Sequence, residues 1–224
     1  MIETRNKLYP SMMCVKPWDT VSACQLFEKT GIAGLHIDIM DGSFVPNITL
    51  GTDYCKALRE VTALPLDIHL MIDRPEDKLG WFPIREGDTV SIHVESTKHL
   101  GRAVEIVRKL GGIPFAALDP ATSINTIEEI LPELGGVLIM TVNAGFAGQK
   151  LIPYTLGKIA RLRETLNDAG LSDMPIEVDG NVSAENLVRM KNAGADRFVI
   201  GTSGFLRGEI GEKTREEIIR FENL

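Results

Sequence analysis

The sequence predicts a single-domain α/β protein with the (β/α)₈ barrel fold, also called a TIM barrel. Short apolar runs of strand length alternate with amphipathic segments of helical spacing along the whole chain of 224 residues. Eight such strand–helix units in about 220 residues are typical of a compact barrel and not of an open doubly wound sheet. No linker, low-complexity tract or abrupt change of composition divides the chain, so residues 1–224 are expected to form one domain.

The predicted strands are short apolar runs bounded by turn residues. They cover residues 9–13, 34–40, 64–71, 89–94, 113–118, 136–142, 176–179 and 197–201. Helical spacing follows several of them: one helix is expected to stop at Gly111 and another at Gly170. Ser183 is a suitable N-cap for a helix that ends near Gly194. Pro83 and a glycine three residues earlier interrupt the third predicted helix.

Composition excludes several classes of function. The chain has 24 Lys and Arg residues against 31 Asp and Glu residues, and its net charge of −7 argues against nucleic acid as a partner. No apolar run approaches the ~18 residues of a membrane span, and the N-terminus lacks the apolar core of a signal peptide. The three cysteines form no CxxC pair, which is typical of reduced thiols in a cytoplasmic protein. We therefore expect a cytoplasmic protein without a membrane or nucleic-acid partner.

Polar side chains interrupt the inner face of three predicted strands. Strand alternation places His36, Asp38 and Met40 on one face of run 34–40, and it places Asp67, His69 and Met71 on one face of run 64–71. Asp179 shares a face with Glu177 at the end of run 176–179. Catalytic groups of these barrels lie at the carboxyl ends of strands, so His36, Asp38, His69 and Asp179 are expected to meet there. Imidazole and carboxylate ligands suit a divalent metal such as zinc, iron(II), manganese or cobalt.

Each residue also has a simpler interpretation. An isolated His69 would more often be a hydrogen-bonded core histidine, and Asp179 could be a turn residue before Gly180. Met40, Met71 and Met140 could fill gaps in the core, although their places at three strand ends also suit an apolar cap over a reacting group.

Two glycine-rich turns follow the sixth and eighth runs, at residues 143–149 and 201–204. Glycines in such turns let the backbone approach a ligand and direct N–H groups at an anion, and late loops of these barrels often bind phosphate. A tight turn without a ligand is the alternative for either loop alone. Both loops are expected beside the Gly180 turn, which favours a phosphate site.

At these positions the chain resembles the ribulose-phosphate 3-epimerase family over nearly its whole length. The matching motifs are PS at 10–11, HIDIMDG at 36–42, FVPN at 44–47, DIHLM at 67–71, MTVN at 140–143, GF at 145–146 and VDG at 178–180. Many members have Pro where Ala144 stands, Gly where Ala147 stands and a second Gly where Asn181 stands. Residues 12–14, Ala147 and residues 201–206 look closer to the allulose-6-phosphate 3-epimerase branch.

The resemblance implies a metal-dependent enzyme that acts on a small phosphorylated ketose. It implies that His36, Asp38, His69 and Asp179 bind one divalent metal ion, zinc first among the candidates, and that Asp38 and Asp179 are the catalytic acid–base pair. It further implies that sugar and phosphate contacts come from Ser11, His69, Gly145, Phe146, Ala147, Gly148, Asp179, Gly180, Asn181, Gly201 and Thr202. A homo-oligomer is also expected.

We expect 3-epimerisation through an enediolate, with two carboxylates serving opposite faces of C3. D-allulose 6-phosphate and D-fructose 6-phosphate are favoured slightly over D-ribulose 5-phosphate and D-xylulose 5-phosphate. A sugar- or nucleotide-phosphate decarboxylase on a related barrel is a second enzyme hypothesis. It would have an Asp-x-Lys pairing where residues 67–69 read Asp-Ile-His, and the missing lysine argues against it. A non-catalytic phosphosugar-binding barrel is the remaining alternative, and the presence of both Asp38 and Asp179 argues against it.

Overall fold

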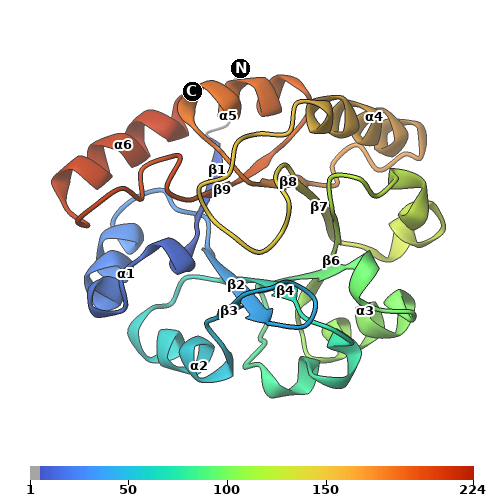
Figure 1. Cartoon of the computed structure of the whole chain (residues 1–224), viewed down its shortest axis with the longest axis horizontal. Helices are drawn as coiled ribbons and strands as arrows, with labels where there is room; N and C mark the ends of the chain where they lie inside the picture. Colours follow the sequence, from blue (N-terminus) through green and yellow to red (C-terminus); the bar gives the residue numbers. More distant parts are fainter. Residues whose placement is uncertain (1–5) are drawn as a thin grey trace.

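The computed structural model describes residues 6–224 and confirms the predicted barrel, with an inner ring of parallel strands inside an outer ring of helices (Figure 1). In the order of their pairing, the parallel strands are β1 (Lys7–Pro10), β9 (Arg197–Ile200), β8 (Ile176–Asp179), β7 (Gly136–Met140), β6 (Ile113–Leu118), β5 (Thr89–His93), β4 (Leu66–Met71) and β2 (Leu35–Asp41). A single bridge between Ser11 and His36 joins β1 to β2.

The strand predictions are confirmed to within a few residues, with two differences. The first run was expected at 9–13, but β1 ends at Pro10 and the chain then turns into a 3-10 helix at Met12–Cys14. The amide of Cys14 donates to the carbonyl of Ser11 in this turn, which ends the strand. The sequence did not predict β3 (Ile48–Thr49), a two-residue strand antiparallel to the end of β2.

Helices cover the outside of the barrel in most of the predicted places. They are α1 (Thr20–Glu28), α2 (Thr52–Val61), α3 (Leu100–Lys109), α4 (Tyr154–Asp168), α5 (Ala184–Asn192) and α6 (Glu212–Glu222). The Ser183 hydroxyl accepts a hydrogen bond from the amide of Asn186, so the predicted N-cap is confirmed. After β4 the interrupted segment forms only the short 3-10 helices Pro75–Asp77 and Leu79–Trp81, and after β6 a 3-10 helix at Ile124–Glu133 contains Pro132.

The two faces of each strand have different surroundings. Leu35, Ile37 and Ile39 of β2 point outward and join the large apolar core between the strands and the helices. His36 and Asp38 alternate with them and are also buried, but they point into the barrel. The core between the strands and the helices is therefore apolar, whereas the barrel interior combines polar side chains with smaller apolar clusters such as Met40, Val45 and Met71.

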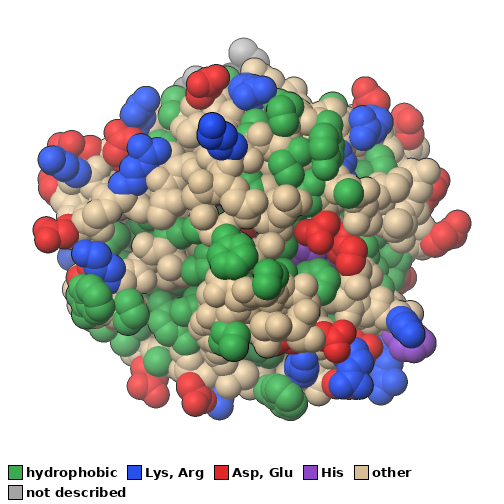
Figure 2. All heavy atoms as spheres, in the orientation of Figure 1, with side chains coloured by type: hydrophobic (Ala, Val, Ile, Leu, Met, Phe, Trp, Pro, Cys, Tyr) green, Lys and Arg blue, Asp and Glu red, His purple; other side chains and the backbone are tan. Residues whose placement is uncertain are grey.

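The beginning and the end of the described chain are joined. The side-chain amide of Asn6 donates to the carbonyl of Phe221 at 2.8 Å, which ties the start of β1 to α6. No helix among residues 6–224 is long and apolar enough to cross a membrane. Figure 2 shows Lys and Arg side chains mainly around the edge of the face that contains the mouth of the barrel.

Candidate active site

The structure brings the four predicted metal-binding side chains together inside the barrel. His36 Nε2 lies 3.3 Å from Asp38 Oδ1 and 3.8 Å from Asp179 Oδ2. His69 Nδ1 lies 3.5 Å from Asp38 Oδ1 and 3.6 Å from Asp179 Oδ2. One ligand atom from each of the four residues lies within 4.8 Å of the other three. The four side chains come from β2, β4 and β8, as the strand alternation predicts.

Two histidine nitrogens in this cluster have no hydrogen-bond partner in the structure. His36 Nε2 and His69 Nδ1 are buried, and both point at the carboxylates of Asp38 and Asp179 without the geometry of a hydrogen bond. An unsatisfied buried polar atom is costly, so such atoms point to a bound ligand. Two imidazole nitrogens and two carboxylate oxygens are a suitable donor set for a divalent cation, so the residues present fit a metal ion.

Neighbouring side chains orient the first two members of the cluster. Asp67 Oδ2 lies 2.6 Å from His36 Nδ1, an arrangement typical of metal-binding histidines. The Ser11 hydroxyl donates to Asp38 Oδ2 at 2.6 Å, which leaves Asp38 Oδ1 directed at the histidines. Ser11 was predicted to contact the sugar; it lines the cavity, and it also fixes the orientation of Asp38.

A buried charge network below this cluster was not predicted. Arg197 pairs with Glu177 at 2.5 Å, and its guanidinium lies 4.1 Å from the ring centroid of Tyr9 and 4.7 Å from that of Phe115. It also lies 3.7 Å from Asp67, the partner of His36. Strand alternation places Asp67 and Glu177 on the inner face, but it does not show that an arginine from β9 compensates their negative charges.

The electrostatic environment shifts the pKa values of the two carboxyl groups of the site in opposite directions. Burial acts to raise the pKa of Asp38, but His36 and His69 outweigh it and hold this pKa well below its usual range. Burial and the negative charge of Asp38 raise the pKa of Asp179 to about 7. Burial opposes a charge on His36, yet Asp38 and Asp67 raise its pKa well above the ordinary value. The field that holds a proton on His36 is also favourable for a metal cation.

A small cavity of about 60 Å³ opens above the cluster at the mouth of the barrel. Asp38 and Asp179 reach its wall, whereas His36 and His69 are completely buried beneath them. The predicted contact between His69 and the sugar therefore stays a prediction. The three methionines of the predicted apolar cap, Met40, Met71 and Met140, all line the cavity.

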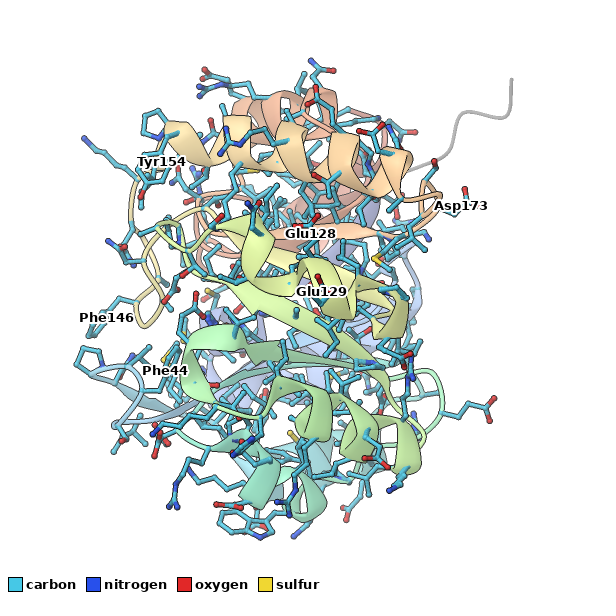
Figure 3. The ribbon with its side chains drawn as sticks, turned by 90° about the vertical axis from the view of Figure 1, so that its right-hand side faces the viewer. Phe44, Glu128, Glu129, Phe146, Tyr154 and Asp173 are labelled. Carbon is cyan, nitrogen blue, oxygen red and sulfur yellow. The ribbon has the colours of Figure 1, made fainter. Side chains whose placement is uncertain are left out.

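The predicted phosphate-binding residues form one side of this cavity. They are Gly145, Phe146, Ala147, Gly148, Gly180, Asn181, Gly201 and Thr202, and all eight line it. Phe146 is 52% exposed and lies with Phe44 at the same end of the barrel (Figure 3). Arg207 was not among the predicted site residues. Its guanidinium donates to the carbonyls of Thr202 and Ser203 and so supports the loop after β9.

Comparisons with known proteins identify the family of this chain. Residues 7–205 match the model of the ribulose-phosphate 3 epimerase family. A ribulose-phosphate 3-epimerase of Bacillus subtilis is 40% identical over 192 residues, which are 86% of each chain. One of Aquifex aeolicus is 34% identical over 209 residues, 93% of this chain and 94% of that one. The tryptophan synthase alpha-subunit of Pyrococcus furiosus shares the fold with a TM-score of 0.69 and 12% identity, covering 99% of this chain and 100% of that one. The Bacillus subtilis and Aquifex aeolicus relatives are named as epimerases, which are isomerases of carbohydrate phosphates, and the chain belongs to the ribulose-phosphate 3-epimerase family.

Proposed function

We propose that this protein is a metal-dependent 3-epimerase of a ketose phosphate that uses two acid–base groups. One observation carries the proposal: Asp38 of β2 and Asp179 of β8 face the same two unpartnered histidine nitrogens and both reach the cavity. The proton on C3 of a ketose lies next to the C2 carbonyl and is therefore acidic enough to be removed by a positioned carboxylate. Inversion needs its removal on one face and its return on the other, which two carboxylates on separate strands can perform without moving.

His36, Asp38, His69 and Asp179 would hold the metal ion. When bound, a divalent cation would supply Lewis-acid stabilisation of the negative charge that develops on the sugar oxygens. Zinc is the first candidate for this donor set, and iron(II), manganese and cobalt also fit. Met40, Met71 and Met140 would exclude water from the carbon being inverted.

The metal assignment can be tested by metal analysis of the purified protein. We expect about one divalent ion per chain, and its loss in His36→Ala and His69→Ala while the far-UV circular dichroism spectrum is preserved. His99→Ala is the matched control because His99 is exposed at the start of α3. Full retention of metal in both site variants would contradict the assignment.

The two-base scheme can be tested in heavy water. Asp38→Asn and Asp179→Asn should each abolish epimerisation, because an amide cannot transfer the proton. Either variant can still exchange the C3 proton of the one epimer that faces its remaining carboxylate. Metal content must be measured in parallel, and a metal-loaded Asn variant that epimerises at the wild-type rate would refute the scheme.

We propose that the phosphate group is held mainly by backbone N–H groups of the loops that follow β7, β8 and β9. Gly201 allows a clean test, because its φ is not in the left-handed region and an added Cβ would meet only Cys14 Sγ, at 3.3 Å. Gly201→Ala should raise KM for the sugar phosphate by narrowing the cavity, with little change in thermal stability. Gly80→Ala, at a glycine with open space around it and outside the cavity, is the control. Equal KM values in the two variants would contradict the site.

For the sugar we propose D-allulose 6-phosphate, interconverted with D-fructose 6-phosphate. Ala147, Asn181 and residues 201–203 line the predicted phosphate end, which is where a hexulose 6-phosphate and a pentulose 5-phosphate differ in length. Asn181 also donates from its side-chain amide to the hydroxyl of Ser203 at 2.8 Å, a contact that glycine at this position cannot make. The relatives are named for a ribulose phosphate, in one case for ribulose 5-phosphate, and these names support D-ribulose 5-phosphate as the second candidate. A kcat/KM for D-ribulose 5-phosphate well above that for D-allulose 6-phosphate would reverse the choice.

Two sequence predictions about the whole protein stay proposals. We propose a homo-oligomer and a cytoplasmic location, with a small phosphorylated sugar as the partner and neither nucleic acid nor membrane. Sedimentation equilibrium of the purified chain tests the first, because a monomer mass at micromolar concentration would contradict it. Fractionation of cells that express the chain tests the second.

A further inference from the structure

A line of hydrogen bonds leads from His69, in the proposed metal site, to the rim of the barrel. His69 Nε2 lies 2.8 Å from His93 Nε2, and the two ring planes are 19° apart. His93 Nδ1 lies 3.2 Å from Glu95 Oε2. Both histidines are completely buried, whereas the Glu95 side chain is 24% exposed just after β5. His93 and Glu95 have no role in the mechanism described above.

The chemistry of the line fixes the place of each proton. A neutral imidazole has one N–H donor and one lone pair. His69 Nδ1 needs its lone pair to bind a metal, so its proton must lie on Nε2 and be donated to His93 Nε2. His93 Nε2 must then present its lone pair, so its proton lies on Nδ1 and is donated to Glu95. A carboxylate only accepts hydrogen bonds, and it therefore sets the direction of the whole line.

Other contacts keep Glu95 suited to this task. The backbone amide of Asp119 donates to Glu95 Oε1 at 2.9 Å, which leaves Oε2 for His93. Burial acts to raise the pKa of Glu95, but hydrogen bonds from His93 and Thr122 outweigh it and lower this pKa to about 2. The carboxylate at the end of the line is thus ionised and can accept the hydrogen bond from His93.

A second metal site is the alternative interpretation of these residues, because ligand atoms of His93, Glu95 and Asp119 lie within 4.8 Å of one another. The proton positions argue against this. A cation on His93 Nδ1 would need the lone pair there and would move the proton to His93 Nε2. That proton would be donated to His69 Nε2, and His69 Nδ1 would become protonated toward Asp38 and Asp179. A cation here would therefore displace the one in the active site.

We propose that Glu95, acting through His93, is a positioning residue that fixes the tautomer and the orientation of the metal ligand His69. The inference rests on the proposed metal site and deepens it. It makes the two histidine ligands unlike each other: His36 is held by the buried carboxylate of Asp67, whereas His69 is held through an imidazole by a carboxylate at the rim.

Two measurements test the proposal. Long-range ¹H–¹⁵N NMR spectra of the metal-free wild-type chain should show His93 protonated on Nδ1 and His69 on Nε2, with mixed tautomers in Glu95→Ala. Chelator competition should show a zinc Kd about 10-fold higher in Glu95→Ala, as is typical of outer-shell partners. Glu95→Gln should lose less affinity, because its amide oxygen can still accept from His93.

Asp119→Asn is the matched control, since its carboxylate lies 3.8 Å from His93 Nδ1, beyond hydrogen-bond distance. A Glu95→Ala Kd within about twofold of wild type would overturn the proposal, as would a wild-type His93 protonated on Nε2. The spectrum of the wild type decides the matter even if the variant does not fold. A wild-type chain that binds no metal would instead refute the metal site itself.

Discussion

Gly180 directly follows β8, and both its backbone conformation and its close neighbour Val142 require a glycine there. Its φ is +119°, and a Cβ there would lie 2.6 Å from Val142 Cγ2 and 2.9 Å from the Val142 backbone nitrogen. The left-handed backbone costs a residue with a side chain about 1–2 kcal/mol, and overpacking costs about 1–3 kcal/mol. Gly180→Ala should therefore destabilise the fold by about 2–5 kcal/mol. At about 2–4 °C per kcal/mol for a domain of this size, Tm should fall by about 4–20 °C.

Gly148→Ala is the matched control for this prediction. Gly148 also has a positive φ, +82°, but nothing lies within 4 Å of an added Cβ, so only the backbone cost of about 1–2 kcal/mol applies. Differential scanning calorimetry of both variants gives the comparison. Gly180→Ala should also lower kcat, because Asp179 is the preceding residue. If its Tm falls no further than that of Gly148→Ala, the close approach of Val142 does not restrict position 180.

Two more predictions concern carboxylates. Asp67→Asn should raise the zinc Kd, measured by chelator titration, by about 10–100-fold, because a neutral amide orients His36 less strongly than a carboxylate does. Asp53→Asn, at a side chain that is 96% exposed, is the control in the same titration. Partial burial acts to raise the pKa of Asp41, but hydrogen bonds from backbone N–H groups at 43, 44 and 73 and from Lys78 lower it to about 2. Its stabilising contribution is thus complete above the unfolded pKa of about 3.9 and is lost as the pH falls toward 2. The Tm difference between wild type and Asp41→Asn should shrink over that range, and a constant difference would contradict the assignment.

The sequence predicts the barrel and the convergence of the four proposed metal-binding side chains well, because both depend on strand alternation. Runs such as 176–179 coincide with strands, and alternation alone puts His36 and Asp38 on the inner face beside His69. Ser11 was assigned to the sugar, and its hydrogen bond to Asp38 was not foreseen, because that bond depends on the turn after β1.

Contacts between residues far apart in the sequence were not predictable in this way. Arg197 begins β9, and nothing in its local sequence distinguishes a buried arginine that compensates Glu177 from an exposed one. The line of hydrogen bonds from His69 through His93 to Glu95 depends on which nitrogen of each ring faces its neighbour. The spacing of residues along a β-strand carries no such information. The two-residue strand β3 is too short to have a recognisable period.

The join between β1 and β2 differs from the other contacts around the barrel, because it has one bridge, from Ser11 to His36, and a hydrogen bond from the Ala33 amide to the Leu8 carbonyl in place of a regular ladder. Both Ser11 and His36 also belong to the proposed metal site, since Ser11 orients Asp38 and His36 is a proposed ligand. A folding intermediate in which β1 has not yet docked would contain all four side chains of the proposed metal site but would lack the hydroxyl that directs Asp38. High-affinity metal uptake during refolding would therefore show that β1 has docked on β2 and closed the barrel. It would distinguish a closed barrel from an open, curled sheet with the same secondary structure content.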